Sequence, residues 1–304
     1  MVNHSWNGAD RIAMPGPRHP ATTFQVMHDL TAGLGLKPQH FDDAHACRAT
    51  GLWFEVHPEN YMVAGGPRLA WLDAIRERHP LSLHGVAMSL AADGAPDATH
   101  LGRLAVLVDR VQPVLVSEHL AWSTWGGVYR PDLLPVPRTR QALHRIVSNI
   151  ALVQDRLRRP IALENPSHYL AFVEHEFEEL DFLVEIARRS GCTLLLDVNN
   201  VYVSANNLGH RPEAVIDAVP AELITEIHLA GHSADPTLGT RLLIDSHDAP
   251  IAPQVWSLYE RLIARIGARP TLIERDEHVP SFSELLAERE RAQDVLQGVL
   301  AEVA

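Results

Sequence analysis

The sequence contains only two cysteines, Cys47 and Cys192, and no Cys-x-x-Cys pair. A disulfide framework and a zinc ribbon are therefore excluded, and both cysteines are expected to be small buried apolar residues. The N-terminus lacks an apolar core followed by a small-residue cleavage site, and no run of about 18 apolar residues occurs. We therefore expect a cytoplasmic protein with neither a signal peptide nor a membrane span.

Basic residues are also in the minority, since the formal charge is -12 and the isoelectric point is near 5.8. Binding nucleic acid normally requires a basic stripe, so this class of partner is excluded. The sequence has no Gly-x-Ser-x-Gly motif of a serine hydrolase and no glycine-rich phosphate loop. Paired carboxylates alone, as in a glycosidase, would leave 18 histidines unexplained.

What the sequence does contain is a regular alternation of short apolar runs and helical patterns. The eight runs of strand type are Gly33–Leu36, Leu52–Val56, Leu81–His84, Val114–Val116, Ile161–Leu163, Thr193–Leu196, Glu226–Leu229 and Thr271–Ile273. The helical patterns include Arg68–Arg78, Thr99–Val111, Arg138–Arg158, Phe177–Arg189, Ala252–Ile266 and Ser281–Val299.

This alternation predicts one α/β domain, a (β/α)8 TIM barrel, over residues 25–304. Residues 1–24 are rich in Pro, Gly and His and are expected to form an irregular extension. Two connections, Trp122–Pro137 and Gly231–Pro250, are longer than a helix needs. Because both would begin at the catalytic face of a barrel, we expect them to wall the active site.

The residues that end the predicted strands are strongly biased toward imidazole and carboxylate, which together suit a borderline or hard divalent metal. A single histidine there also fits a hydrogen-bonded core residue, and a single carboxylate fits a buried salt bridge. Among these segments, however, only Glu-Arg-Asp at 274–276 brings a cation beside its carboxylate. The strand-end residues are His57, Glu59, His84, Glu118, His119, Glu164, Asn165, Asp197, Asn199, Asn200, His228, His232 and Glu274.

Two further groups lie in loops that follow the sixth and seventh strands. Asp245 and His247 form an Asp-x-His pair that suits one ion, and His210 would reach the same ion or lie on the surface.

The motifs SEHLAW, LENPS, LLLDVNNVYVSA, EIHLAGH and DSHDAP resemble those of the multinuclear non-heme iron-dependent oxidative enzymes. That family includes the methanobactin-forming oxidase and the bufferin-modifying enzymes, and the resemblance covers roughly residues 33–286. WFEVHPENYM and LSLHGVAMSL are most similar to the bufferin branch, whereas Arg275 departs from the aromatic residue expected there. The resemblance implies a TIM barrel related to endonuclease IV and xylose isomerase.

The resemblance also implies two or three iron ions and their ligands. Glu118 is expected to bridge two ions, and Glu118, Asp245 and His232 are the expected catalytic residues. Alternation along the strand end is expected to point the neighbouring His119 away from the bridge. The first ion would lie near His57, His84 and Glu118; the second would share Glu118 with Asn165, Asp197, His228 and Glu274; the third would lie near His210, Asp245 and His247.

Members of this family use mixed-valent Fe(II)/Fe(III) and dioxygen to modify ribosomally made precursor peptides, often at cysteine. The implied products are a thiooxazole or an oxazolone with a thioamide, and a separate partner protein commonly delivers the peptide. The alternatives are a metal-dependent hydrolase or isomerase of the endonuclease IV and xylose isomerase type, or a metal-storage or peptide-binding module without catalysis. The identity of the bound metal separates the enzymatic alternatives.

Overall fold

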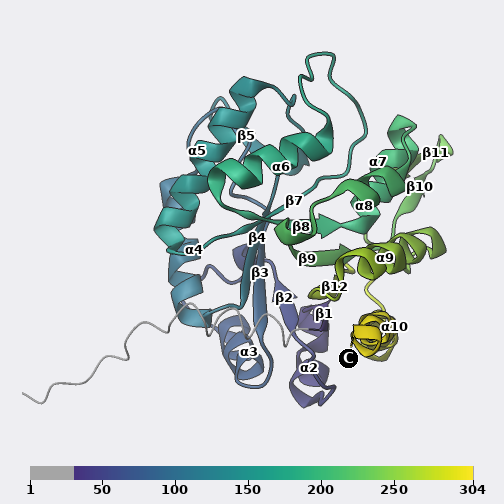
Figure 1. The fold of residues 1–304 in the computed structure, drawn as a ribbon. Coiled ribbons are helices and arrows are strands. Elements are labelled where there is room, and N and C mark those ends of the chain that lie inside the picture. The colour runs from purple at the N-terminus through teal and green to yellow at the C-terminus, as the bar shows by residue number, and fades with distance from the viewer. Residues whose placement is uncertain (1–30, 304) are drawn as a thin grey trace, which may run out of the picture.

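The computed structural model describes residues 31–303, in which eight parallel strands close into a barrel (Figure 1). The strands follow one another around the barrel in chain order, which confirms the predicted (β/α)8 fold and all eight predicted strands. Residues 1–24, predicted as an irregular extension, lie outside the described residues. The barrel strands are β1 (Ala32–Gly35), β2 (Phe54–Val56), β3 (Leu81–Gly85), β4 (Leu115–His119), β7 (Ala162–Glu164), β8 (Thr193–Asp197), β9 (Ile224–Leu229) and β12 (Thr271–Ile273).

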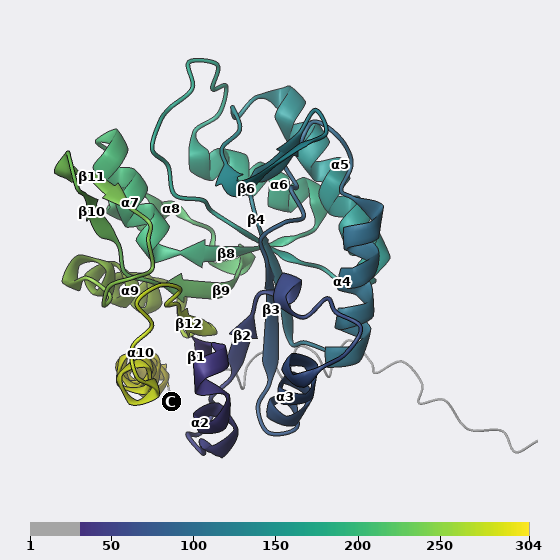
Figure 2. The ribbon, with the colours of Figure 1, turned by 180° about the vertical axis from the view of Figure 1, so that it is seen from behind.

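Helices surround the barrel and cover the outer face of its strands (Figures 1 and 2). The six predicted helices are confirmed to within a few residues, because each has an apolar stripe that packs on the strands. The side chains of Asp97 and Thr139 cap α4 and α5 by accepting backbone N–H groups. The six helices are α3 (Pro67–Arg76), α4 (Ala98–Val111), α5 (Arg140–Leu157), α6 (Glu179–Ser190), α9 (Pro253–Ile266) and α10 (Phe282–Val303).

Three further helices, α2 (Phe41–Ala46), α7 (Val198–Leu208) and α8 (Pro212–Ala218), were not predicted from the sequence. Helix α7 contains four asparagines and three valines, which have low intrinsic helix propensity. It forms because Asp197 ends β8 and caps the helix, its carboxylate accepting the N–H of Asn200 at 2.6 Å. This cap and the burial of Val198, Val201 and Val203 therefore outweigh local propensity in this segment.

Each of the two long connections contains an antiparallel hairpin. The first pairs β5 (Trp122–Trp125) with β6 (Val128–Leu134), and the second pairs β10 (Ser233–Asp235) with β11 (Gly239–Ile244). The hairpins follow β4 and β9, so both start at the C-terminal end of the barrel (Figure 2).

The interior of the barrel is apolar near its N-terminal end. Trp53, Leu115 and Leu272 form a buried cluster separate from the large core between strands and helices. The Trp53 indole donates a hydrogen bond to the Thr31 carbonyl at 3.0 Å. Gly33 is required beside it, because a Cβ at this position would lie 2.4 Å from the Trp53 ring. These residues close the bottom of the barrel.

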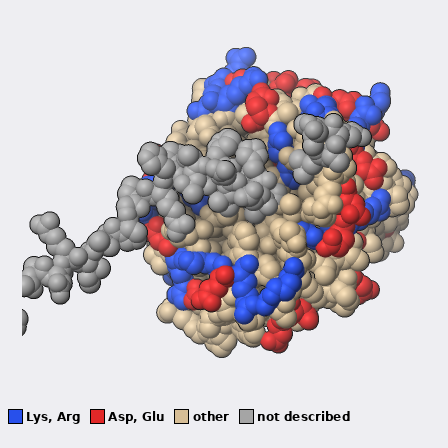
Figure 3. All heavy atoms as spheres, turned by 60° about the horizontal axis from the view of Figure 1, so that its bottom comes forward, with Lys and Arg blue, Asp and Glu red and all other residues tan. Residues whose placement is uncertain are grey.

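Surface charges of both signs are interspersed. On the face drawn in Figure 3, Lys and Arg side chains lie in small groups next to Asp and Glu side chains. None of the helices within residues 31–303 is both long enough and apolar enough to cross a bilayer.

Candidate metal centre

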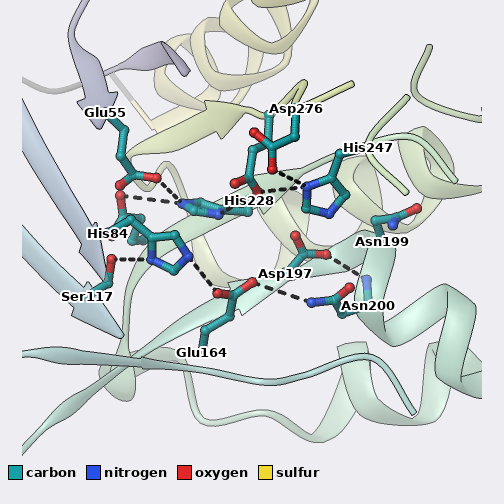
Figure 4. Close-up of polar contacts among 12 residues, drawn as sticks. Glu55, His84, Ser117, Glu164, Asp197, Asn199, Asn200, His228, His247 and Asp276 are labelled. Atoms are coloured by element: carbon teal, nitrogen blue, oxygen red, sulfur yellow. Dashed lines mark hydrogen bonds and ion pairs between the residues drawn. The ribbon is translucent and has the colours of Figure 1, made fainter. Parts of the chain in front are cut away.

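One set of polar side chains points into the C-terminal mouth of the barrel. Successive residues of a strand face opposite sides, and laterally paired residues of parallel neighbours share a face. Figure 4 shows the labelled members of this set converging from separate strands. The pairs that fix the inward face are Glu55 with Ser82, His84 with Ser117, His119 with Glu164 and Asp197 with His228. Glu226 and Glu274 contact His228 on this same face.

Glu164 lies between two imidazoles at the centre of the set. Its Oε2 atom is 3.0 Å from Nε2 of His84 and 3.0 Å from Nε2 of His119, and the two nitrogens are 3.4 Å apart. Glu164 and His84 are almost completely buried. Adjacent ligands about 3 Å apart are what metal bonds of roughly 2.1 Å at right angles produce.

His228 lies between two groups of carboxylates. Its Nδ1 atom is 3.2 Å from Oε2 of Glu274, while its Nε2 atom is 3.2 Å from Glu55 and 3.8 Å from Glu226. Glu55 also accepts a hydrogen bond from the Ser82 hydroxyl at 2.7 Å. His228 therefore links the mouth of the barrel to a deeper pair of acids.

A second group borders this centre on the side of β12. His247 Nε2 is 2.9 Å from Asp245, and its Nδ1 atom is 3.2 Å from Asp276 and 3.6 Å from Glu274. His57 Nε2 lies 3.8 Å from the same Asp276. The Asp245 and His247 pair predicted from the sequence is thus brought against Glu274.

His57, His84 and His119 direct their Nε2 atoms toward the centre, while their Nδ1 atoms contact other parts of the protein. Nδ1 of His57 contacts the His84 carbonyl at 3.2 Å, and Nδ1 of His119 contacts the Gly85 carbonyl at 2.9 Å. Because a carbonyl only accepts, each of these Nδ1 atoms carries the hydrogen, and Nε2 of the neutral ring has a lone pair. Nδ1 of His84 contacts the Ser117 hydroxyl at 2.8 Å. Such contacts on the far nitrogen are typical of metal-binding histidines.

The centre has more negative charge than its imidazoles balance. Burial and the charge of Glu55 raise the pKa of Glu226 to about 8, and burial with the charge of Glu164 raises the pKa of Asp197. Burial alone would raise the pKa of Glu164, but the charges of His119 and His84 lower it to about 2. Burial disfavours a charged His119, yet Glu164 and Glu118 raise its pKa to about 10. A cation in the centre would relieve this imbalance.

Several buried polar atoms of the centre have no hydrogen-bond partner among residues 31–303, and such atoms are costly unless they bind something. Glu164 Oε2 is one of these atoms, although it lies 3.0 Å from the Nε2 atoms of both His84 and His119. The donor set of nitrogen and oxygen, without sulfur, fits a divalent ion such as iron. The unpartnered atoms are Glu164 Oε2, Asp197 Oδ2, both oxygens of Glu226, both ring nitrogens of His228 and His247 Nε2.

Glu118 does not lie where the sequence analysis expected a bridging ligand. Its Oε2 atom accepts the N–H of Met88 at 3.1 Å, and its Oε1 atom accepts the N–H of His119 at 3.0 Å. The physical reason is strand alternation: Ser117 pairs laterally with His84 and faces inward, so His119 also faces inward and Glu118 does not. Glu164 occupies the central position that was assigned to Glu118.

Two other expected ligands also lie apart from the centre. Asn165 uses its amide to hold the backbone of Asp197, accepting its N–H at 2.9 Å and donating to its carbonyl at 3.1 Å. His210 is exposed just beyond the C-terminal end of α7 and lines a small cavity outside the barrel together with Asn165. Helix α7 leads the chain away from Asp197, so His210 does not join Asp245 and His247.

The expected catalytic residues Asp245 and His232 are joined by one amide at the edge of the centre. Asn199 donates to Asp245 at 2.7 Å through Nδ2 and contacts Nδ1 of His232 at 2.8 Å through Oδ1. Burial lowers the pKa of His232. Arg275, which departs from the bufferin pattern, is buried and pairs with Glu288 at 2.9 Å on α10.

Five participants were not predicted as ligands from the sequence: Glu55, His119, Glu164, Glu226 and Asp276. Strand alternation would have found Glu55 and Glu226. Glu55 and Glu226 lie two residues before His57 and His228, and therefore share their inward face. His119 and Glu164 pair laterally and face inward with Ser117, whose orientation follows from its pairing with His84. Asp276 lies beyond β12, where alternation no longer applies.

Comparison with solved structures supports the fold. The chain is similar to endonuclease IV from Thermus thermophilus, with 17% identity, a TM-score of 0.54, and coverage of 90% of this chain and 99% of that one. It is also similar to a xylose isomerase-like TIM barrel protein from Mycobacterium smegmatis in complex with magnesium, with 13% identity and a TM-score of 0.56 over 90% and 99% of the two chains. At these identities the likeness shows the fold alone.

Comparison of sequences identifies the family. A UPF0276 protein from Caulobacter vibrioides is 63% identical over 266 residues, which cover 88% of this chain and 95% of that protein. The UPF0276 protein RB0508 from Rhizobium meliloti is 47% identical over 94% of this chain and 92% of its own. The model of the RiPP precursor modification enzymes MbnB/TglH/ChrH matches residues 31–297. The chain therefore belongs to the MbnB/TglH/ChrH family of enzymes that modify the precursors of ribosomally synthesised and post-translationally modified peptides.

Proposed function

We propose that this chain is a multinuclear iron- and dioxygen-dependent oxidase that modifies cysteine, or another residue, in a ribosomally made precursor peptide. The product would be a thiooxazole or an oxazolone with a thioamide. The observation that carries the proposal is the convergence of unpartnered carboxylate oxygens and imidazole nitrogens in the barrel mouth. Membership of the precursor-modifying family supplies the class of substrate.

The donor atoms are numerous enough for more than one ion. Groups of three whose ligand atoms lie within 4.8 Å of one another recur across the mouth, and one tetrahedral or octahedral ion would not use them all. His84 and His228 belong to more than one group, as expected for residues between neighbouring ions. The groups include His84 with His119 and Glu164, His84 with His228 and Glu274, Glu164 with Asp197 and His228, Glu55 with Glu226 and His228, and His57 with Glu274 and Asp276.

Bound iron would supply the redox chemistry with dioxygen and would lower the pKa of a substrate thiol. The protein side chains prepare the site. The Ser117 hydroxyl and the Gly85 carbonyl fix the rings of His84 and His119 through their Nδ1 atoms. Asn200 donates to Glu164 at 3.4 Å and so orients the central carboxylate. Burial of this shell excludes water from the reacting atoms.

Asp245 and His232 are the groups we propose to handle protons. The Oδ1 atom of Asn199 accepts from Nδ1 of His232, which leaves Nε2 of the neutral ring with a lone pair. Because burial lowers the pKa of His232, the ring is neutral near pH 7 and suits the role of a base.

The first test is metal analysis of the purified protein after anaerobic loading with iron. We expect two or more iron ions per chain and an absorbance due to Fe(III). One zinc ion with negligible iron would contradict the proposal and would favour phosphoester hydrolysis, whereas magnesium or manganese would favour sugar isomerisation.

The second test is co-expression with a cysteine-containing precursor peptide encoded nearby, with and without a candidate partner protein, followed by intact-mass analysis. We expect a loss of a few hydrogens or of a small carbon fragment from the peptide. A peptide that binds but keeps its mass in the presence of iron and dioxygen would instead indicate a binding module.

A further inference from the structure

A cavity of about 240 Å³ opens beside the metal centre, between the ends of β1, β2 and β12. Its lining includes the buried Glu55 and Glu274 and the half-buried His57, which belong to the centre, together with the half-buried Lys37 and the exposed Arg68. Cavities for drug-sized ligands commonly measure about 300–1,000 Å³. This one therefore suits a terminal residue or a single side chain rather than a folded segment.

Lys37 is the only lysine in the sequence, and every other cationic side chain apart from the histidines is arginine. Its side chain is 16% exposed, and its ammonium group is paired with Asp276. A lysine ammonium is a compact charge on a flexible stem, whereas arginine is a planar fork. The chain thus has its one compact cation in the wall of this cavity, next to the metal centre.

Both cations of the cavity have hydrogen-bond donors to spare. An ammonium has three donors, and within residues 31–303 Lys37 uses one of them on Asp276. A guanidinium has five N–H donors, and in the same range Arg68 makes one hydrogen bond, to the Asn60 carbonyl at 3.4 Å. Arg68 is exposed, so its donors remain accessible from the cavity and from solvent.

The cavity is lined by charged groups of both signs. The buried carboxylates of Glu55 and Glu274 repel an anionic group, while the ammonium of Lys37 and the exposed guanidinium of Arg68 attract one. The lining also includes Leu36, Val56 and Tyr61, whose apolar atoms suit the carbon atoms of a ligand. A peptide whose reacting residue lies at the centre would therefore place a carboxylate beside Lys37 and Arg68 rather than beside Glu55 and Glu274.

We propose that this cavity binds the substrate peptide beside its reacting residue, and that Lys37 and Arg68 hold a carboxylate of that peptide. The inference rests on the proposed function, since it requires a peptide substrate. The carboxylate belongs either to the peptide C-terminus or to an Asp or Glu side chain near the reacting residue. Both sources offer the same bidentate anion to the same two cations.

Three synthetic probes distinguish the sources: acetylated Ala-Cys-Gly with a free carboxylate, the same peptide amidated, and amidated Glu-Cys-Gly. Binding to the iron-loaded full chain is measured without oxygen by calorimetry. We expect at least one acidic probe to bind about tenfold more tightly than the neutral one, the effect of a single charge-assisted hydrogen bond. Equal affinities for all three probes, or no binding at millimolar concentration, would overturn the proposal.

The single lysine gives an independent readout. In the sequence only Lys37 and the N-terminal amine are available for acylation, so acetylation of Lys37 can be followed by mass spectrometry. We expect the acidic probe to protect Lys37 and the neutral probe to leave it reactive. Protection by both probes alike would show that the peptide covers the cavity without pairing its carboxylate, and would contradict the proposal.

Variants of Lys37 and Arg68 test whether these two residues cause the preference for acidic probes. Lys37→Met and Arg68→Gln should each reduce the difference between acidic and neutral probes, while Arg188→Gln on the distant α6 is the matched control and should keep it. Because Arg68 is exposed, its variant is expected to fold. Retention of the full preference in both cavity variants would exclude these cations. Binding is measured without turnover, so this test is independent of the test for peptide oxidation. If the protein prefers acidic probes but does not oxidise a peptide, the cavity still binds a carboxylate and the proposed oxidase activity is wrong.

Discussion

The two ends of the barrel interior differ in polarity and in how far their polar atoms are hydrogen-bonded. At the N-terminal end, Trp53, Leu115 and Leu272 fill the space, and the one polar atom of the Trp53 ring has its hydrogen bond. At the C-terminal end, the interior is filled with acids and imidazoles, many without partners among the described residues. The two regions lie on the same strands and are separated by only a few residues along each.

This contrast separates the sources of stability and function. Burial of apolar surface favours folding at the lower end, whereas burial of unpaired carboxylates opposes it at the mouth. A cluster that costs stability is retained in a TIM barrel where chemistry occurs, at the C-terminal ends of the strands. Substitutions at the two ends should therefore have different consequences for stability and for metal binding.

The largest effect on stability is expected from Trp53→Ala at the lower end. The ring is fully buried, so its removal should lower the free energy of unfolding by about 3–5 kcal/mol. Trp125→Ala is the matched control, because Trp125 is 41% exposed on the β5–β6 hairpin and should lose about 1 kcal/mol or less. Denaturant unfolding measures both. Equal losses would contradict the assignment of Trp53 as the plug of the barrel.

The largest effect on metal binding is expected from Glu164→Gln in the mouth. This change removes the charge between His84 and His119 and should lower iron affinity by roughly 100-fold, with loss of peptide oxidation. Glu118→Gln is the decisive comparison, because the sequence pattern made Glu118 the bridge. Its contacts are to backbone N–H groups, so iron content should fall less. A larger loss in Glu118→Gln would restore the original assignment.

A smaller effect is expected from Ser117→Ala, which leaves every donor atom of the metal centre in place. The hydroxyl contacts Nδ1 of His84 at 2.8 Å and fixes the orientation of the ring. Its loss should weaken iron binding about tenfold, as outer-shell changes do. Ser148→Ala on α5 is the control, since within residues 31–303 its hydroxyl bonds only the local His144 carbonyl. Titration with iron under anaerobic conditions should separate the two variants.

The sequence was sufficient to predict the barrel because apolar runs and helical stripes have fixed periods. It did not predict α7, where a cap at Asp197 and packing outweigh the propensities of valine and asparagine. The barrel could be predicted because its apolar residues repeat at regular spacings, whereas α7 depends on contacts that appear only in the folded chain.

The main obstacle to predicting the site was the register of the strands, which decides which side chains face the barrel interior. The strand-end motifs placed His57, His84, Asp197, His228, Asp245, His247 and Glu274 at the mouth, where the structure has them. Which of Glu118 and His119 faces inward depends on the pairing of Ser117 with His84, which no single segment of sequence reveals. A shift of one residue reverses the assignment. The position of His210 depended in the same way on the length of α7.

The smallest expected effect is a change in the free energy of unfolding with pH. It measures how much the burial of carboxylates at the mouth of the barrel destabilises the fold. Glu226 has a pKa of about 8 in the folded protein, raised from 4.5 by burial and by Glu55. Between these values the unfolded chain has lost this proton while the folded protein keeps it. The folded state therefore loses stability as the pH rises from 4.5 to about 8, and loses no more from this group above that range. Asp197, whose pKa is also raised, contributes with the same sign.

Metal-free protein should accordingly unfold more easily at about pH 8 than at about pH 5. Glu226→Gln removes the titrating group but keeps its shape, so its free energy of unfolding should change less over this interval. Unfolding by urea in the presence of a chelator, at several pH values, measures the two slopes. Iron loading should also flatten the slope of the unsubstituted protein, because a bound cation favours the ionised carboxylates that burial disfavours. If the two proteins show the same slope, Glu226 is already ionised at the acidic end of the range, and the acidic mouth costs less than its burial implies.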